Sequence, residues 1–229
     1  MKDPKTEKEK EQAAKEAVKK IKNDQIVGLG SGSTAYFAIK EIGDKVHQGL
    51  IIKGIPTSEK TKELALSLNI PLIDIHTVDS IDITIDGADE FDPDLSLIKG
   101  GGGALLREKV VASLTKTQII IADSSKKVAK LGRFKVPVEV IPFASSYVLR
   151  QLKIMGGQGV IRRVGDNPYL TDQGNYIIDT DFGLIDNPMI LGNRLSGVVG
   201  LVEHGLFINL VDMVIMGNGD SVEVLNAKS

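Results

Sequence analysis

The spacing of apolar and polar residues predicts alternating helices and strands through the first 130 residues. Ala14, Ala17, Val18 and Ile21 recur at helical spacing, so we expect an amphipathic helix over residues 5–22. Apolar runs predict strands at 25–30, 50–55, 81–85 and 118–122, and periodic segments predict helices at 34–46, 58–68 and 104–114. This alternation is typical of an α/β domain with a Rossmann-like, doubly wound, mostly parallel sheet.

A different order of elements follows residue 130. Strand patterns lie at 136–141, 159–164, 176–179 and 206–210, and helix patterns lie at 145–154 and 189–202. This β-α-β-β-α-β order indicates a smaller ferredoxin-like α+β domain, and residues 211–216 are expected to return to the first sheet. We therefore expect a Rossmann-like catalytic domain of residues 1–131 and 207–229, and a ferredoxin-like domain of residues 132–206.

Composition excludes several classes of function. The 229 residues include no cysteine, which excludes disulfides, thiolate metal sites and a cysteine nucleophile, and His47, His76 and His204 lack the spacing of metal ligands. A formal net charge of -2 gives no general attraction for nucleic acid or anionic lipid. No apolar run approaches the ~20 residues that a membrane span needs. We expect a cytoplasmic protein that binds a small molecule, with neither nucleic acid nor membrane as a partner.

The loops that follow the predicted strands carry the candidate chemistry, because ligands of open parallel sheets bind beyond the carboxyl ends of the strands. The first of these loops reads GSGSTA, residues 30–35, and offers backbone N–H groups and hydroxyls to an anion such as phosphate. Ser33 stands where a dinucleotide-binding motif requires glycine or alanine, which weakens a NAD-binding interpretation. An ordinary tight turn is the alternative.

The second loop, DGADE, places Asp86, Asp89 and Glu90 directly after an apolar strand. Carboxylates this close together repel one another unless they bind hydroxyl groups, a cation or a lysine. The stretch lacks the alternating ligands of a calcium-binding loop, so sugar hydroxyls fit it better than a metal ion. A metal site and a solvated acidic turn are the alternatives.

The third loop, KGGGGALLREK, contains four consecutive glycines, which are costly in backbone entropy unless the backbone must approach a ligand closely. Glu108 follows one helical turn after Ala104 and is expected to face the same pocket as the loop. A solvated surface glutamate is the alternative interpretation of Glu108. The fourth loop, ADSSKK, brings Lys126 to the same edge of the sheet, where it could hold phosphate.

Together and in this order, these four motifs closely resemble those of the ribose-5-phosphate isomerase family of type A. The segments TSEKT at 57–61 and VPVEVIP at 136–142 also resemble this family, so the similarity spans nearly the whole chain. Ser31 departs from the family pattern, in which threonine is common, but retains a hydroxyl. The resemblance implies interconversion of D-ribose 5-phosphate and D-ribulose 5-phosphate through an enediolate, in the non-oxidative branch of the pentose phosphate pathway.

The resemblance also implies the residues of the site. Glu108 would be the catalytic base, and the substrate would be bound by Ser31, Gly32, Ser33, Thr34, Asp86, Gly87, Ala88, Asp89, Lys99, Gly100, Gly101, Gly102 and Lys126. Lys10 is a further candidate for the phosphate. Asp86 and Asp89 are candidates for opening the sugar ring. No metal and no organic cofactor are expected, because the substrate carries its own activating carbonyl.

Two other classes of function share this architecture. A sugar-phosphate deaminase or lactonase would be expected to use a histidine near the carboxylates, and only His76 lies on the expected side. A non-catalytic sugar-phosphate sensor would be expected to have lost candidate catalytic residues, which are all present. The family resemblance further implies a homodimer or homotetramer, with the ferredoxin-like domain as the oligomerisation module.

Overall fold

The computed structural model describes residues 3–227 and divides the chain into two compact units. The first unit contains residues 1–88, 107–127 and 210–229, and the second contains residues 89–106 and 128–209. The second unit therefore takes in residues 89–106 as well as the ferredoxin-like segment expected at 132–206. Each unit has a hydrophobic core of its own.

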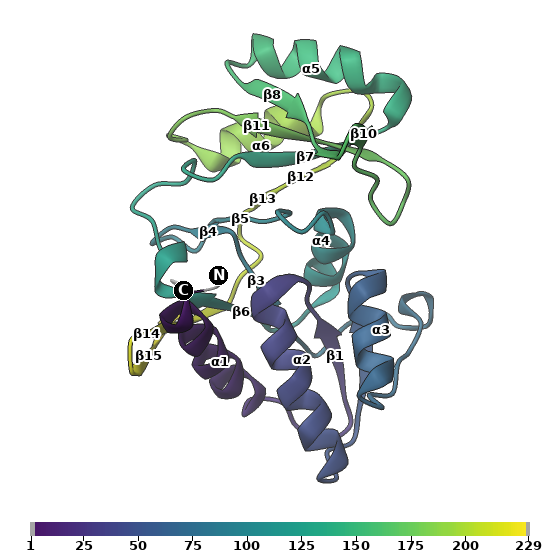
Figure 1. The fold of residues 1–229 in the computed structure, drawn as a ribbon, viewed down its shortest axis with the longest axis vertical. Helices are drawn as coiled ribbons and strands as arrows, with labels where there is room; N and C mark the ends of the chain where they lie inside the picture. The colour runs from purple at the N-terminus through teal and green to yellow at the C-terminus, as the bar shows by residue number, and fades with distance from the viewer. Residues whose placement is uncertain (1–2, 228–229) are drawn as a thin grey trace. The chain divides into compact units, whose positions relative to one another are not determined.

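The first unit is built on a six-stranded sheet with the order β15-β14-β6-β3-β1-β2 (Figure 1). All neighbouring strands are parallel except β15, which pairs with β14 in the antiparallel direction. The strands are β1 (Gln25–Leu29), β2 (Ile52–Pro56), β3 (Ile83–Gly87), β6 (Gln118–Asp123), β14 (Met213–Asn218) and β15 (Ser221–Asn226). The predicted mostly parallel α/β sheet is confirmed, and β15 is an edge strand that the sequence pattern missed.

Helices cover both faces of this sheet. They are α1 (Pro4–Val18), α2 (Gly32–His47), α3 (Glu59–Ser67) and α4 (Leu105–Leu114), with short 3-10 turns at η1 (Ile75–Thr77) and η2 (Ser124–Lys126). Val27 packs in one core with residues of α1, α2 and α3, whereas its neighbour Ile26 packs with Val111 and Leu114 of α4. Successive strand residues point to opposite faces, so this division shows a doubly wound arrangement.

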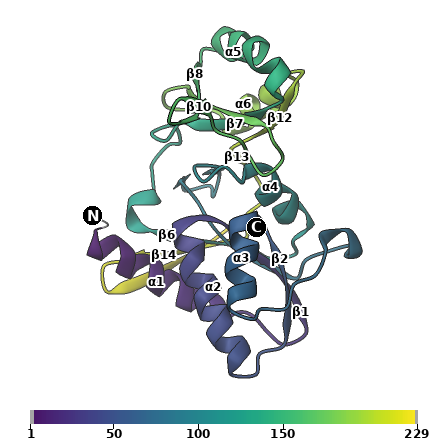
Figure 2. The ribbon, with the colours of Figure 1, turned by 45° about the vertical axis from the view of Figure 1, so that its right-hand side comes forward.

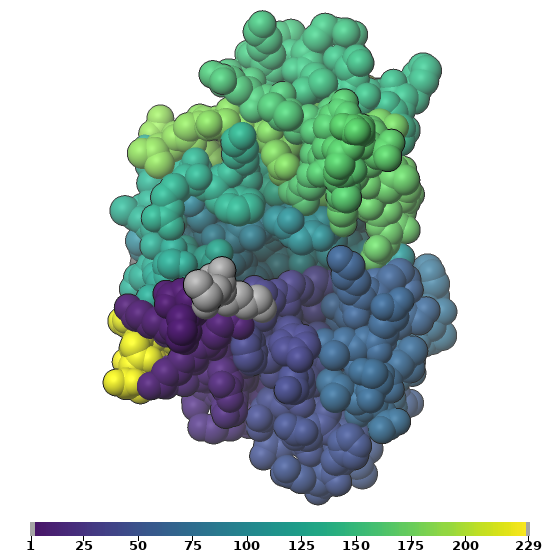
Figure 3. Space-filling model, viewed as in Figure 1, coloured from purple at the N-terminus to yellow at the C-terminus, as the bar shows by residue number. Residues whose placement is uncertain are grey.

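Helix α1 ends at Val18, four residues before the predicted end at 22. Its apolar face, formed by Ala13, Ala14 and Ala17, is completely buried. The helix contacts β6, β14 and β15, and Figure 3 shows it in purple against the yellow C-terminal hairpin. The N-terminal helix is thus an integral part of the first unit.

The second unit contains a four-stranded antiparallel sheet with the order β12-β7-β11-β8. Its elements are β7 (Val136–Val140), α5 (Ser145–Ile154), β8 (Gln158–Ile161), β11 (Tyr176–Asp181), α6 (Pro188–Ser196) and β12 (Leu201–His204), preceded by the 3-10 turn η3 (Pro142–Ala144). Both helices contribute residues to the core of this unit, and Figure 2 shows them beside the sheet. The predicted ferredoxin-like order is confirmed, but its last strand is β12 and not the segment predicted at 206–210.

Smaller strands complete the second unit. A hairpin joins β9 (Arg163–Val164) to β10 (Asn167–Pro168), and a three-stranded sheet joins β13 (Leu206–Phe207), β5 (Leu97–Ile98) and β4 (Glu90–Phe91). The strand predicted at 159–164 is therefore interrupted at Arg162, and the strand predicted at 206–210 is short and belongs to this small sheet.

The helix predicted at 189–202 ends at Ser196, and β12 follows it. Gly197 and Gly200 interrupt the helix, and Gly200 has a φ of +84°, which favours glycine. A Cβ atom on Gly200 would lie 2.2 Å from the Cβ atom of Ala144. The apolar spacing of this segment suggested a longer helix because it continues smoothly into a half-buried strand.

Within residues 3–227, none of the helices combines the length and the apolar character needed to cross a membrane.

Candidate active site

The predicted site residues occupy both units, and each group is described within its own unit. The first unit holds Ser31, Gly32, Ser33, Thr34, Asp86, Gly87, Ala88, Glu108 and Lys126. The second unit holds Asp89, Lys99, Gly100, Gly101 and Gly102. In the first unit the loops lie at the carboxyl ends of β1, β3 and β6, as the βα alternation predicted.

The loop after β1 is positioned by a network of hydroxyl groups. The Oγ atom of Ser31 lies 2.7 Å from Thr57 Oγ1, 2.9 Å from Ser58 Oγ and 3.2 Å from Thr61 Oγ1. Thr61 in turn donates to the carbonyl oxygen of Gly30 at 2.9 Å. The TSEKT segment therefore holds the loop against the start of α3, and a hydroxyl at position 31 is needed for this contact.

Lys10 of α1 reaches the same loop. Its Nζ atom lies 3.3 Å from Ser33 Oγ and 3.0 Å from Glu7 Oε1, and its side chain is 11% exposed. The first turn of α2, which contains Ser33 and Thr34, has no acidic residue. A cation beside the unpaired N–H groups of a helix N-terminus creates a favourable environment for an anion.

Glu9 fixes the helix that carries Lys10. Its carboxylate accepts hydrogen bonds from Ser124 N–H at 2.9 Å, Ser124 Oγ at 2.8 Å and Gly219 N–H at 2.9 Å. Burial by itself would raise the pKa of Glu9, but the donors of Gly219 and Ser124 outweigh burial and hold the pKa below its usual value. Glu9 is thus a charged anchor between α1 and the ends of β6 and β14.

Asp86 at the end of β3 is almost completely buried. Its Oδ1 atom accepts hydrogen bonds from the N–H groups of Ser31 at 3.0 Å and Gly87 at 2.7 Å. A Cβ atom on Gly30 would lie 2.2 Å from this oxygen. Glycine at position 30 is therefore required for the carboxylate of Asp86 to bind the neighbouring loop.

Glu108 lies in the first turn of α4 and is only 6% exposed. The interpretation of Glu108 as a solvated surface residue is therefore wrong. The adjacent Arg107 turns to α3, where its Nη1 atom lies 2.8 Å from Glu59 Oε1. Carboxylates buried beside a loop that follows a strand are frequent at functional sites, so Glu108 remains the candidate for the reacting group.

Lys126 ends the 3-10 turn η2, which follows β6. The preceding Ser124 binds Glu9, whereas the following Lys127 forms an ion pair with Glu223 at 2.9 Å. Lys126 is partly exposed. Its position at the carboxyl end of β6 agrees with the predicted edge of the sheet.

In the second unit, the other carboxylates of the DGADE segment bind backbone amides. Asp89 Oδ2 accepts a hydrogen bond from Gly101 N–H at 2.7 Å. Glu90 accepts hydrogen bonds from the N–H groups of Gly132 at 2.9 Å and Phe134 at 2.6 Å. These bonds give the crowded carboxylates separate structural partners, which the sequence did not reveal.

Lys99 is a buried cation in the second unit, with 3% of its surface exposed. Its Nζ atom lies 5.4 Å from the centre of the Phe207 ring, and its backbone N–H donates to Gly205 O at 2.8 Å. An aromatic ring stabilises a nearby ammonium group electrostatically. Lys99 is therefore held in place before any ligand binds.

Two of the three histidines contact groups within the fold. His47 Nδ1 lies 3.0 Å from Gly43 O within α2, and His204 Nε2 lies 3.3 Å from Ser196 Oγ. Over residues 3–227, no three side chains of histidine, cysteine, aspartate or glutamate are grouped in a way that could hold a metal ion.

Comparisons with known proteins agree on one family. The family model of ribose 5-phosphate isomerase A (phosphoriboisomerase A) matches residues 53–221. The ribose-5-phosphate isomerase A of Sphingopyxis alaskensis is 46% identical over 216 residues, which cover 94% of this chain and 95% of that protein. A solved D-ribose-5-phosphate isomerase in complex with phospho-erythronic acid has a TM-score of 0.94 at 41% identity, covering 96% of this chain and 99% of that chain. The enzyme of Methanocaldococcus jannaschii has a TM-score of 0.91 at 42% identity, covering 95% and 97% of the two chains.

Proposed function

The chain belongs to the ribose 5-phosphate isomerase A family, and we propose from this membership how its residues carry out the reaction. The protein is an aldose–ketose isomerase that interconverts D-ribose 5-phosphate and D-ribulose 5-phosphate in the non-oxidative branch of the pentose phosphate pathway. The observation that carries this conclusion is the similarity over 94% of the chain. A sensor, a deaminase and a lactonase are not favoured, because the relatives are isomerases.

Glu108 is the proposed base. It removes the proton from C2 of the opened aldose, the electrons of the C–H bond form the enediolate, and the proton returns to C1, while a second proton moves between O1 and O2. One carboxylate can serve both carbon atoms, and a positioned base typically contributes ~10² to 10⁴ in rate. Burial of Glu108 supports this role, because water around the carboxylate is largely excluded.

The negative charge of the enediolate needs donors that are already in place. We assign this role to the ammonium group of Lys99 and to backbone N–H groups of Gly100–Gly102. The burial of Lys99 and its contact with Phe207 support this assignment, since both restrict the side chain before the reaction begins.

The phosphate group of the substrate is assigned to the first unit. Gly32, Ser33 and Thr34 supply N–H and hydroxyl donors at the N-terminus of α2, and Lys10 and Lys126 supply positive charge. The contact between Lys10 and Ser33 supports this assignment and extends the phosphate site to α1.

Asp86 and Asp89 are the proposed acid–base pair for ring opening, with Gly87 and Ala88 lining the substrate beside them. Each aspartate accepts a backbone N–H bond that fixes its orientation, which supports a directed role in proton transfer. The substrate supplies its own carbonyl group, so we propose that neither a metal nor an organic cofactor takes part.

A coupled assay with ribose 5-phosphate tests the function directly, with unphosphorylated ribose as the control. We expect formation of ribulose 5-phosphate and at most weak turnover of ribose. Binding of ribose 5-phosphate without turnover would instead identify a sensor, and release of ammonia from an amino-sugar phosphate would identify a deaminase.

We also propose two domains, a Rossmann-like catalytic domain of residues 1–131 and 207–229 and a ferredoxin-like domain of residues 132–206. The ferredoxin-like domain would assemble the enzyme into a homodimer or homotetramer. We propose that the enzyme acts in the cytoplasm. Exposed apolar side chains in the ferredoxin-like segment support its role in assembly; they include Phe143, Ile154, Val160, Leu184, Ile190 and Val199. Phe143 is the most exposed of these side chains, at 99%, and is therefore the position that we choose to test the interface.

A further inference from the structure

Arg162 holds the carbonyl groups of the glycine run in the second unit. Its Nη1 atom lies 3.2 Å from Gly100 O and 3.1 Å from Gly101 O. Arg162 is the residue that separates β8 from β9, so a break in the edge of the ferredoxin-like sheet places its guanidinium group on these two peptides.

Arg162 is itself fixed on two sides. Its Nε and Nη2 atoms donate to the two carboxylate oxygens of Asp179, with the Nε bond at 2.9 Å, and its Cζ atom lies 5.7 Å from the centre of the Tyr169 ring. A bidentate pair of this kind fixes the direction of the guanidinium group as well as its position. The Arg162 side chain is 16% exposed.

Tyr169 extends the same contact to the next peptide. Its hydroxyl donates to Gly102 O at 3.3 Å. Burial raises the pKa of Tyr169, so the hydroxyl keeps the proton that it donates. Three successive carbonyl groups, those of Gly100, Gly101 and Gly102, are therefore held by Arg162 and Tyr169.

Holding a carbonyl also sets the direction of the N–H group in the same peptide, because the two point in opposite directions across a trans peptide. The peptide between Gly100 and Gly101 confirms this relationship, since its carbonyl faces Arg162 and its N–H group binds Asp89 at 2.7 Å. The next peptide has its carbonyl on Arg162 as well, so the N–H group of Gly102 is turned away from Arg162. This N–H group has no acceptor within residues 3–227.

Packing within the chain explains three of the four glycines but not Gly102. Gly100 and Gly103 have φ angles of +100° and +85°, and a Cβ atom on Gly101 would lie 2.6 Å from Asp89 Oδ1. A Cβ atom on Gly102 would meet nothing within 4 Å. The chain itself therefore does not require glycine at this exposed position, whereas a ligand that approaches the backbone closely would require it.

We propose that Arg162, fixed by Asp179 and Tyr169, is a positioning residue that holds the peptide between Gly101 and Gly102 with its N–H group directed at the enediolate oxygen. Glycine peptides can rotate with little steric resistance, so without Arg162 the carbonyl could replace the N–H group and repel the developing charge. This inference rests on the proposed role of the glycine run as an oxyanion donor.

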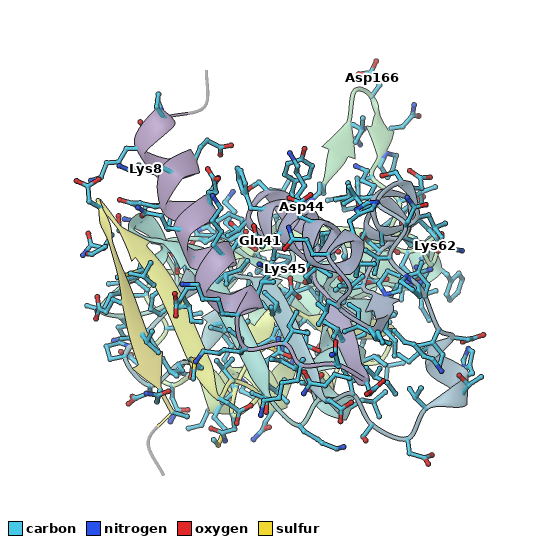
Figure 4. The ribbon with its side chains drawn as sticks, turned by 90° about the horizontal axis from the view of Figure 1, so that it is seen from below. Lys8, Glu41, Asp44, Lys45, Lys62 and Asp166 are labelled. Atoms are coloured by element: carbon cyan, nitrogen blue, oxygen red, sulfur yellow. The ribbon has the colours of Figure 1, made fainter. Side chains whose placement is uncertain are left out.

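The test compares Arg162→Met with Arg163→Met. The control residue is adjacent, is exposed, and bonds through Nη1 to the carbonyl of Asp166 at the tip of the β9–β10 hairpin (Figure 4). Removing an oxyanion donor typically costs ~10² to 10³ in kcat, and loss of its orientation should cost less, about 10- to 100-fold. We expect this loss for Arg162→Met with a KM within about threefold of the parent value, whereas Arg163→Met keeps its kcat.

Two further readouts separate positioning from a general structural role. Phospho-erythronic acid carries a carboxylate in place of the enediolate oxygens, and Arg162→Met should weaken its inhibition by the same factor as it lowers kcat/KM. Arg162, Arg163 and Asp179 line a pocket of about 700 Å³ that reaches Gly101, but of the two arginines only Arg162 bonds to the glycine carbonyl groups. Guanidinium ion should therefore partly restore kcat to Arg162→Ala and leave Arg163→Ala unaffected.

A kcat within twofold of the parent enzyme for folded Arg162→Met and Arg162→Ala would overturn the proposal. If Arg162→Met does not fold, Asp179→Asn tests the same device, because it weakens the bidentate pair that directs the guanidinium group of Arg162. An unchanged kcat and inhibitor affinity for Asp179→Asn would count against the proposal. Gly102→Ala and Glu108→Gln are measured in parallel. Normal turnover of both Gly102→Ala and Glu108→Gln would contradict the proposed function of Gly102 and Glu108. Low turnover of these two variants, together with normal turnover of Arg162→Met, would contradict only the positioning role of Arg162.

Discussion

The Nζ atom of Lys10 lies 3.3 Å from the Oγ atom of Ser33, although the two residues are 23 positions apart in the chain. The contact depends on Glu9, whose three hydrogen bonds dock α1 against the ends of β6 and β14. Gly217 is part of this arrangement, because a Cβ atom there would lie 2.1 Å from the carbonyl oxygen of Glu9. A cation is thereby built into the loop that is assigned to the substrate phosphate.

Replacing Lys10 by methionine should raise KM for ribose 5-phosphate by about tenfold or more and change kcat only a few-fold. A hydrogen bond to a charged group contributes about 1.5–3 kcal/mol, and 1.4 kcal/mol corresponds to a factor of ten in affinity. Steady-state kinetics of Lys10→Met against Lys8→Met measures this effect. Lys8, labelled in Figure 4, is exposed on the same helix and pairs with Asp220. Equal KM values for the two variants would remove Lys10 from the phosphate site.

Glu108→Gln should lower kcat by at least ~10², because the amide cannot accept the C2 proton. The amide has nearly the same shape as the carboxylate, so thermal unfolding and calorimetric binding of ribose 5-phosphate should stay close to those of the parent enzyme. Glu63→Gln on the exposed side of α3 is the matched control and should keep full activity. Turnover of Glu108→Gln near the parent value would assign the base to another residue.

Treatment with EDTA followed by dialysis should leave activity unchanged, because the proposed chemistry uses the carbonyl group of the substrate and side-chain donors. The assay compares treated and untreated enzyme in metal-free buffer. If activity is lost and Mg²⁺ or Zn²⁺ restores it, this result would identify the DGADE segment as a metal site and contradict the mechanism.

Sequence reasoning located the loops of the site because their position follows from local patterns. Strands and helices alternate with the expected spacing, so the GSGSTA, DGADE and ADSSKK segments had to follow β1, β3 and β6. The segment around residue 200 was less predictable, since a helix-like apolar spacing there continues into β12 and only Gly197 and Gly200 mark the boundary. Local periodicity cannot decide between these structures without the partner strand.

Contacts between residues far apart in the chain could not be predicted from the sequence. Arg162 and Tyr169 bind the glycine run from about 60 residues away, and nothing in their local sequence distinguishes them from solvated residues. The same holds for Glu90, which looked like part of a ligand-binding cluster but anchors the backbone of Gly132 and Phe134. Tertiary packing decides these roles.

Phe143→Asp should shift the enzyme toward monomers if the ferredoxin-like domain forms the subunit interface. Burying a charged side chain in an apolar interface is strongly unfavourable, whereas the folded monomer tolerates it because Phe143 is fully exposed. Light scattering after size-exclusion chromatography measures the mass. Ile51→Asp, an exposed apolar position in the first unit, is the control and should keep the parent mass. An unchanged mass for Phe143→Asp would place the interface elsewhere.

Glu139 on β7 makes a prediction about stability and pH. Its Oε1 atom accepts bonds from Thr171 at 2.9 Å and Asn175 at 3.0 Å, while no partner within residues 3–227 binds the buried Oε2 atom. Burial raises the pKa of Glu139, the two donors offset this in part, and the charges of Glu203 and Asp172 raise it further.

The raised pKa means that the folded protein holds this proton at pH values where the unfolded chain, with a pKa near 4.5, has released it. The free energy of unfolding should therefore fall as the pH rises from the pKa of the unfolded chain through the raised pKa of Glu139 in the folded protein. Glu139→Gln removes the buried charge, so the variant should be more stable than the parent at pH 8, and the difference should shrink toward pH 4. Urea unfolding at both pH values measures this, with Glu63→Gln as the exposed control. If Glu139→Gln instead loses stability relative to the parent on going from pH 4 to pH 8, then the fold stabilises Glu139 as a carboxylate.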